Sequence, residues 1–281
     1  MRNVLTIAWR EIRAYFTSPL AYVVIGVFLC LSGAAFWVHL VRFSQYCLQY
    51  GSNPYVLSQL NVNELVIRRL FGFMSVVFLS VIPFVSMRLL AEERKSGTAE
   101  LLFTSPVTTT QVILGKFFGA AFLLVSMIGL TLTYPLLILF SNARPDMKTT
   151  FVGYLGVLLM GLAFLSIGLL ISSMTENQIV AAVGAFGAFL VLWIISWLGD
   201  TATITLADIM NKVTFGMWDK LHFGMAGPTL GDLLRKLSII EHFEDFSKGV
   251  FDTEHAVFYL SVVFFALFLT QRVVDSRSWR G

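Results

Sequence analysis

Few side chains in this sequence have the types and spacing that catalysis or metal binding needs. The four histidines are scattered along the chain: His39, His222, His242 and His255. No H-E-x-x-H pair and no paired cysteine ligands occur, so an intramembrane metalloprotease would have no zinc ligands. The pairs Glu241-His242 and Glu254-His255 are more typical of a solvated helix face. We expect no catalytic residue and no metal site.

The sequence also contains no phosphate-binding loop. Such a loop needs G-x-x-x-x-G-K-[ST]. The Gly115-Lys116 pair is followed by Phe117, and Thr110 stands where the first glycine belongs. We therefore expect no cofactor in this chain. If ATP powers its activity, ATP and Mg²⁺ are bound by another polypeptide.

Acidic residues are missing from the apolar stretches. Ion-coupled transporters usually keep an Asp, Glu or His near the membrane midplane. Here Glu64, Glu92 and Glu176 all fall outside the apolar cores. This placement weighs against proton-coupled transport, although backbone carbonyls could still bind Na⁺.

The composition indicates which elements hold these residues. Of the 281 residues, 57% are hydrophobic and 13% are charged, whereas soluble domains are about one quarter charged. The net charge of +3 is too small and scattered to indicate nucleic-acid binding. The chain is therefore expected to be an all-α integral membrane protein in contact with the lipid bilayer.

Six stretches approach the roughly 20 apolar residues that a membrane-spanning helix requires. They divide one transmembrane domain, residues 1–281, into spans at about 20–40, 70–90, 112–140, 152–171, 179–198 and 256–274. Ser18-Pro19 is a plausible helix start, and Pro83 and Pro135 interrupt two spans. We expect Lys116 to extend toward the membrane surface from within its span.

Polar segments flank these spans. Residues 1–18 predict an amphipathic helix in the membrane interface, because Leu5, Trp9 and Ile12 share one face and Arg2, Arg10 and Arg13 share the other. A helix docked on a partner is the alternative. Residues 199–255 form the predicted outer loop, in which Ile239, Phe243, Phe246 and Val250 share a helical face. A packed amphipathic helix is our interpretation there, with a substrate gate as the alternative.

The arginines around the first span favour a cytoplasmic N-terminus. Three of them precede the span and only Arg42 follows it closely. Six spans then place the C-terminus in the cytoplasm as well, in the inner membrane of a bacterium. Cys30 lies inside the first span and Cys47 beyond it, so we expect no disulfide between them.

The segment between spans two and three is the most informative. It reads Met87-Arg88-Leu89-Leu90-Ala91-Glu92-Glu93-Arg94-Lys95-Ser96-Gly97-Thr98-Ala99-Glu100-Leu101-Leu102-Phe103-Thr104-Ser105-Pro106-Val107. A charged run follows the span and breaks at Gly97. Thr98 can then cap a short helix with Glu100 in its first turn, and Ser105-Pro106 ends that helix. The pattern predicts a rigid charged elbow in the cytoplasm, with an ordinary solvated loop as the alternative.

This segment resembles the permease subunits of the ABC-2 family, which carry E-E-[KR]-x-x-G-T-x-E-L-L-x-[ST]-x-P at this place. Within the family the chain looks most similar to the gliding-motility-associated permeases, also grouped with multicopper-enzyme-maturation permeases. Further motifs support this: Ala8-Trp9-Arg10-Glu11, Thr175-Glu176-Asn177-Gln178, His242-Phe243-Glu244 and Arg277-Ser278-Trp279-Arg280. The outer loop around 211–234 departs from the pattern by its length.

The resemblance implies a six-helix permease that pairs with a second permease copy or paralogue and with two cytoplasmic ABC ATPase subunits. It implies that the elbow from Glu92 to Pro106 couples the permease to the ATPase. The elbow's candidate contacts are Glu92, Glu93, Arg94, Gly97, Thr98, Glu100 and Pro106. A second contact would be formed by Thr175, Glu176 and Asn177.

Small residues suggest where helices pack closely. Gly115 and Gly119 form a G-x-x-x-G at the foot of span three, and Gly184 and Ala188 belong to a small-residue face of span five. Such contacts could lie within the permease or across its dimer.

Three functions remain open at this point. The first is an ABC-2 type transport subunit that moves a substrate with ATP hydrolysed elsewhere. The second is a membrane scaffold that anchors a motility or enzyme-maturation complex. The third is a secondary transporter or channel, which has no need of the elbow.

Overall fold

The computed structural model describes residues 2–52, 60–95, 107–140, 145–213, 236 and 238–278. Throughout these ranges the regular secondary structure is helical, and six helical segments are long and apolar enough to cross a membrane. They are Pro19–Tyr50, Asn63–Glu93, Thr109–Phe140, Met147–Met174, Gln178–Ile195 and Thr253–Ser276. The predicted all-α architecture with six spans is confirmed.

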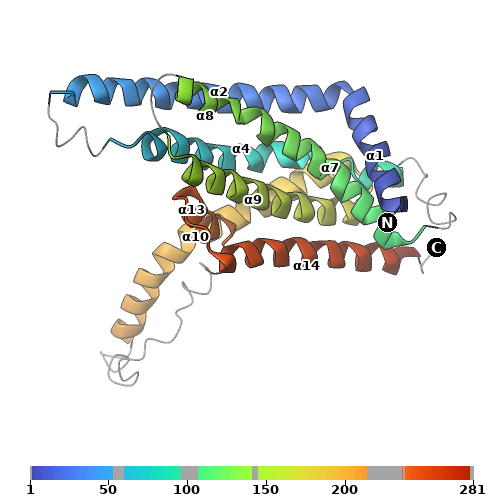
Figure 1. Cartoon of the computed structure of the whole chain (residues 1–281). Coiled ribbons are helices and arrows are strands. Elements are labelled where there is room, and N and C mark those ends of the chain that lie inside the picture. The colour runs from blue at the N-terminus through green and yellow to red at the C-terminus, as the bar shows by residue number, and fades with distance from the viewer. Residues whose placement is uncertain are drawn as a thin grey trace.

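The first two helices meet at Ser18. Helix α1 covers Arg2–Thr17 and α2 covers Pro19–Tyr50. Ser18 has extended backbone angles and its hydroxyl accepts from the amide of Leu20, while Pro19 occupies the first helical position, where no N–H is needed. The chain turns sharply there, so α1 crosses the end of the bundle and packs against α7 (Figure 1).

The second span is assembled from three elements. A π-helical turn, η1 (Asn63–Ile67), leads into α4 (Arg68–Ser86), and a turn over residues 87–90 separates α4 from the short α5 (Ala91–Lys95). Pro83 is accommodated inside α4. The break that sets α5 off therefore comes after the proline and not at it.

The third span is interrupted by its proline. Helix α7 (Thr109–Thr131) and α8 (Thr133–Phe140) are separated at Leu132. Pro135 has no N–H to donate to the carbonyl of Thr131, four residues earlier. That carbonyl instead accepts from the Tyr154 hydroxyl at 2.8 Å, which satisfies it within the bundle. The kink predicted from Pro135 thus has a defined partner on the next span.

Helix α9 (Met147–Met174) is the central span. It packs against α4, α7, α10 (Gln178–Val213), α13 (Ile239–Ser247) and α14 (Thr253–Ser278). About two thirds of the apolar windows of α4 and α9 are buried, 67% and 61%, against 28% for α2, 17% for α10 and 22% for α14. Most residues in the apolar windows of the latter three helices are therefore at least partly exposed, to lipid or to another membrane protein.

Several helices extend beyond the predicted spans. Helix α2 continues to Tyr50, where the span was predicted to end at 40, and α10 continues to Val213, within the predicted outer loop of 199–255. The reason is that hydropathy marks the edge of the hydrocarbon, whereas residues such as Arg42 and Gln45 are compatible with a helix that continues into water. In α13, Ile239, Phe243 and Phe246 are buried as predicted, but Val250 lies past the helix and is exposed.

The bundle has two distinct ends (Figure 1). Both chain ends, α1 and α5 lie at one of them. The opposite end holds the end of α2, η1, α8 and α13. This arrangement agrees with an even number of spans and places α5, the described start of the predicted elbow, beside the N-terminal helix.

Candidate functional site

The break between α4 and α5 is the root of the predicted elbow, and its backbone groups are satisfied by distant side chains. The amide of Leu89 donates to the carbonyl of Ser86, three residues earlier, at 3.1 Å. The Val85 carbonyl, which this amide would bond in a continuous α-helix, is therefore left without that backbone donor. The buried Tyr15 hydroxyl of α1 donates to this carbonyl at 3.0 Å. Burial raises the pKa of Tyr15 far above its ordinary value, so it remains a donor at physiological pH.

Ser172, in the last turn of α9, completes the break. Its hydroxyl oxygen accepts from the amides of Leu90 and Ala91, each at 3.2 Å, and donates to the carbonyl of Met87 at 3.2 Å. A serine hydroxyl has one donor and two acceptor sites, and all three are used here. Ser172 is fully buried, so the end of α9 and the start of α5 are held together out of water.

Arg88 and Glu92 fix the outer side of the same turn. The Arg88 guanidinium makes two hydrogen bonds to the Glu92 carboxylate, at 2.7 and 3.1 Å. Its third nitrogen, Nη1, donates at 3.4 Å to the hydroxyl of Ser18, the residue that caps α2. The bidentate geometry is the strong form of an Arg–carboxylate pair. Through it the elbow is tied to the junction of α1 and α2.

Glu93 points into a cluster of alternating charges. The Lys116 ammonium of α7 lies 2.8 Å from Glu93 and 3.2 Å from Glu11 of α1, and the Arg10 guanidinium lies 3.3 Å from each of the same carboxylates. The side chain of Lys116 is only 2% exposed, and those of Glu11 and Glu93 are 15% and 18% exposed. Three helices, α1, α5 and α7, thus meet at one largely buried ionic cluster.

The expectation that Lys116 extends to the membrane surface is therefore wrong. Its ammonium turns inward because two carboxylates from α1 and α5 receive it. A charge this buried is tolerated only when it is paired and hydrogen-bonded. The presence of Glu11 beside it depends on how closely α1 approaches α7.

Two glycines of α7 permit that approach. A Cβ at Gly115 would lie 2.6 Å from a methyl group of Ile7, and one at Gly119 would lie 2.6 Å from the Cβ of Glu11. Real Cβ atoms do not come this close, so α1 packs onto the bare backbone of α7. The helix that uses this G-x-x-x-G is α1, within the same chain.

On α10 the small residues are used differently. Gly184 is exposed, and a Cβ there would lie 3.1 Å from a methyl group of Ile171, while Ala188 is half-buried. The fully buried small residues are their neighbours Ala181 and Ala185. The closest packing of α10 therefore runs along the row of Ala181 and Ala185.

The predicted second contact lies beside the first. Helix α5 touches the adjoining ends of α9 and α10, where Thr175, Glu176 and Asn177 form the connecting turn. Asn177 caps α10 by accepting from the amide of Ile179 at 2.9 Å, and Thr175 accepts from the amide of Asn177 at 3.2 Å. Their side chains hold the turn in shape, and the Glu176 side chain is exposed.

Part of the predicted site falls outside the described residues. This part includes Gly97, Thr98, Glu100 and Pro106, and for Arg94 only the backbone is described. Sequence reasoning missed Glu11, Tyr15 and Ser172. A lone lysine in an apolar run was the one signal that an acidic partner must exist, and Glu11 is the acidic residue of the N-terminal helix.

The side chains of this site connect helices to one another. Its charges neutralise each other, its polar atoms are paired, and within the described ranges no three His, Cys, Asp or Glu side chains are placed to hold a metal ion. What the arrangement can do is transmit a displacement of α5 to α1, α7 and α9.

Comparison with known proteins agrees with the earlier resemblance. No curated protein matches the sequence at a significant level. The model of the family described as "ABC-2 family transporter protein" matches residues 5–272, nearly the whole chain. This match is to the family in general, so the gliding-motility subtype stays a prediction. With six membrane-spanning helices and this match, the chain belongs to the ABC-2 family of transporter proteins.

Proposed function

We propose that this chain is the permease subunit of an ATP-driven transporter, and that a separate cytoplasmic ATPase docks on its elbow and on the turn at Thr175–Asn177. The observation that carries the proposal is the buried root of the elbow. Ser172 and Lys116 join α5 to α9 and α7 there, Arg10 joins α5 to α1, and Tyr15 joins the end of α4 to α1. A docking loop needs only an exposed surface. A loop that drives transport must also be rigidly connected to the spans.

The geometry separates anchoring residues from residues that can meet a partner. Glu92 and Glu93 were predicted as coupling contacts, and their carboxylates are engaged with Arg88 and Lys116 of the same chain. Lys95 and Glu176, by contrast, are exposed. Lys95 belongs to α5, and Glu176 belongs to the turn between α9 and α10, two helices that α5 contacts. We infer that Glu92 and Glu93 transmit force into the spans, while the exposed surface around Lys95 and Glu176 receives the ATPase.

In this mechanism the ATPase hydrolyses ATP, and the permease changes between two conformations that differ in how its spans are packed. Closure of the ATPase around ATP and Mg²⁺ displaces α5. Because α5 is fixed to α1, α7 and α9 by short hydrogen bonds and ion pairs, these helices shift as bodies, as packed elements do in domain motions. The exposed apolar faces of α2, α10 and α14 leave room for a second permease beside this one.

We place the elbow end of the bundle in the cytoplasm of a bacterium, at its inner membrane. The three arginines of α1 near that end fit the excess of positive charge on cytoplasmic segments. Cytoplasmic ATPases then meet α5 directly. Both chain ends lie on the same side (Figure 1).

The scaffold alternative predicts binding without motion, and one experiment distinguishes the two. In a cysteine-free background (Cys30→Ala and Cys47→Ala), spin labels are placed at Leu48 and Phe140. These residues are each 83% exposed and lie at the end opposite the elbow. The protein is purified from its host together with the nucleotide-binding protein that accompanies it. The label distance is then measured by pulsed electron resonance without nucleotide and with ATP and vanadate.

A transporter gives a nucleotide-dependent change in the distance between the labels, and the double variant Glu92→Gln, Glu93→Gln abolishes it while the ATPase still binds. The matched control is Glu64→Gln, Glu254→Gln at the other end of the bundle, which keeps the change. An unchanged distance in the wild-type complex would favour the scaffold. Hydrolysis of ATP by the isolated chain would overturn the proposal altogether.

A further inference from the structure

A narrow groove of about 180 Å³ lies between α7 and α14, near the elbow end of the bundle. Its walls are mostly apolar: Ile113 and Leu114 come from α7, and Phe264, Leu267 and Phe268 come from α14. Phe264 is 75% exposed and Phe268 is 42% exposed, so the groove opens on the surface of two membrane-spanning helices, where lipid lies. Its volume is below the roughly 300–1,000 Å³ of sites that enclose drug-sized molecules. A single hydrocarbon chain is narrower than such molecules and suits this groove.

The groove becomes polar at its elbow end, because the two helices that form it run in opposite directions (Figure 1). Thr110 lines it from the first turn of α7, and Gln271 lines it from the last turns of α14. Phe264 lies seven positions before Gln271 by their numbers, or about 10 Å deeper along the helix at roughly 1.5 Å per residue. Thr110 stands next to the start of its span, and Gln271 stands five positions before the end of its own. The polar mouth therefore lies near the membrane interface, and the apolar part lies in the hydrocarbon.

Arg272 brings a permanent positive charge to the groove. Its guanidinium carbon lies 5.0 Å from the centre of the Phe268 ring, which is part of the groove wall. A guanidinium over a ring keeps N–H groups that point away from the ring, because its five donors spread around its plane. The Arg272 side chain is exposed and makes no hydrogen bond or ion pair with a residue that the structure describes. Its N–H groups are therefore left to an acceptor beside the groove.

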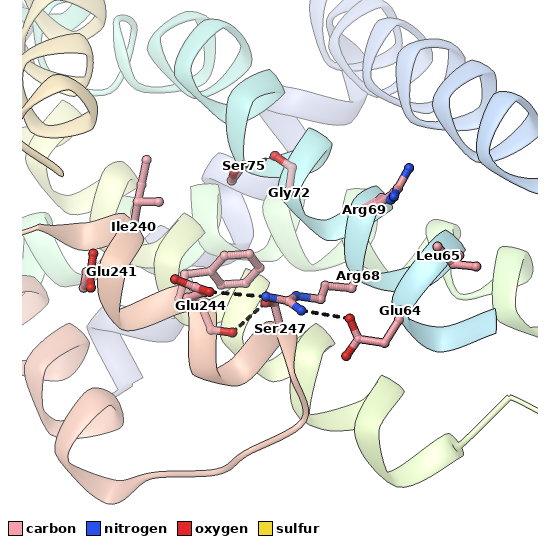
Figure 2. A pocket seen from close by; sticks show the side chains of 11 residues that line it. Glu64, Leu65, Arg68, Arg69, Gly72, Ser75, Ile240, Glu241, Glu244 and Ser247 are labelled. Carbon is pink, nitrogen blue, oxygen red and sulfur yellow. Dashed lines mark hydrogen bonds and ion pairs between the residues drawn. The ribbon is translucent and has the colours of Figure 1, made fainter. Parts of the chain in front are cut away.

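The polar groups of the groove differ from those of the larger cavity at the opposite end of the bundle (Figure 2). That cavity has a volume of about 580 Å³ and lies between α4 and α13. Arg68 joins its two walls, because it lies 3.2 Å from Glu244 of α13 and 2.8 Å from Glu64, so these charges neutralise one another. In the groove, the side chains of Thr110 and Gln271 make no hydrogen bond with a described residue. The groove therefore keeps its polar groups for a ligand.

We propose that this groove binds one acyl chain of a phospholipid from the membrane leaflet at the elbow end, and that the lipid phosphate pairs with Arg272. The acyl chain lies between Leu114 and Phe268, and the ester oxygens accept hydrogen bonds from Thr110 and Gln271. Along α14 the apolar residues are followed by an amide and then by a cation, which is the order of chain, ester and phosphate in the lipid. A lipid without phosphate would fill the groove but leave Arg272 without an acceptor.

Photolabelling of the full chain tests the proposal. The chain is reconstituted into vesicles of digalactosyldiacylglycerol, which has no phosphate, with a small share of phosphatidylglycerol that carries a diazirine on one acyl chain. We expect labelling of residues 264–272 to exceed that of Val23 and Val27, lipid-exposed residues of α2, by about tenfold, since a hydrogen bond to a charged group is worth about that factor. Digalactosyldiacylglycerol with the same photoreactive chain should label both places alike. Equal labelling of both places by phosphatidylglycerol, or an equal preference of both lipids for the groove, would overturn the assignment.

Two variants, each with a matched control, locate the binding. Arg272→Gln should lower groove labelling to the level of α2. Its control is Arg13→Gln, because the Arg13 guanidinium also lies over an aromatic ring, that of Trp9 at 5.2 Å, but on α1. Leu114→Trp fills the groove and should also remove the excess labelling, whereas Leu130→Trp, at a 47% exposed position of the same helix, should leave it unchanged. Labelling of α2 shows in each case that the variant is inserted. If Arg272→Gln or Leu114→Trp keeps the labelling of wild type, the proposal fails.

Discussion

The ammonium of Lys116 lies 2.8 Å from a carboxylate oxygen of Glu93, and the pair joins the third span to the helical start of the elbow. Both partners also contact α1, through Glu11 and Arg10. A buried ion pair is weak support for stability, because desolvation offsets much of the attraction. Its value here is positional, since it fixes which face of α5 meets the bundle.

Replacing Lys116 with Met should destabilise the chain by about 3 kcal/mol, because two nearly buried carboxylates would lose their buried cation and keep only the exposed Arg10 as a partner. Thermal unfolding in detergent measures the loss. The triple variant Lys116→Met, Glu11→Gln, Glu93→Gln removes the stranded charges and should recover most of it. A single variant as stable as wild type would mean that the cluster is solvated in the membrane.

Replacing Ser172 with Ala should loosen the elbow's root. The amides of Leu90 and Ala91 lose their shared acceptor, at a cost of about 1–3 kcal/mol for each buried unpaired group. Ser173 is the matched control, because it is equally buried but donates only to Leu170 of its own helix. Hydrogen exchange of the peptide over residues 87–95 should quicken in Ser172→Ala and stay unchanged in Ser173→Ala. Equal exchange in both would contradict the role assigned to Ser172.

Replacing Gly119 with Ala should displace α1. The new Cβ would meet the Cβ of Glu11 at 2.6 Å, and this atom cannot swing away as a side-chain tip could. We expect a loss of about 1–3 kcal/mol, as for other overpacked contacts. Gly129→Ala has open space around it and should stabilise the helix by about 0.5–1 kcal/mol. The opposite signs in thermal unfolding distinguish a packing clash from a general effect of alanine.

The spans could be predicted from sequence because the hydrocarbon selects for apolar residue type, a property that each residue carries by itself. The contacts at the elbow's root could not. Tyr15 and Val85 are 70 positions apart, and Ser172 and Leu90 are 82 apart, so their hydrogen bonds exist only once the spans have packed. A serine near the end of an apolar run carries no sign of which distant amides it will accept.

The charged run at Glu92 and Glu93 shows the same limit. Its composition predicts a functional segment next to the membrane, but charge alone favoured solvent exposure. The structure turns Glu93 toward Lys116 because Gly115 and Gly119 admit α1 and complete the cluster with Glu11. Residue type gives the charge, whereas packing decides whether a charge faces a partner protein or its own chain.

Acid should weaken the contact between α13 and α14. His255 lies 3.0 Å from Asp245 and Lys248 lies 3.3 Å from it, and these partners hold the pKa of Asp245 below its usual range. A lowered carboxyl pKa stabilises the fold above the unfolded value, near 3.9, and this contribution is lost as the pH falls through the folded value. The melting-temperature difference between wild type and Asp245→Asn should therefore be full at pH 6 and shrink below about pH 4. Glu176→Gln, at an exposed position, serves as the control. A difference that does not change with pH would contradict the assignment.

Cys47 should report which end of the bundle faces outward. It lies in the last turns of α2, 17 residues beyond Cys30 by their numbers, or about 25 Å along the helix. A membrane-impermeant maleimide added to intact cells should label Cys47, because the proposed orientation places it outside. Cys30 is also at the surface of the chain, but it should stay unlabelled because that surface faces hydrocarbon. Each single-cysteine variant is its own control after the membrane is opened with detergent. Labelling of Cys47 only after opening would reverse the orientation and place the elbow outside, where no cytoplasmic ATPase could reach it.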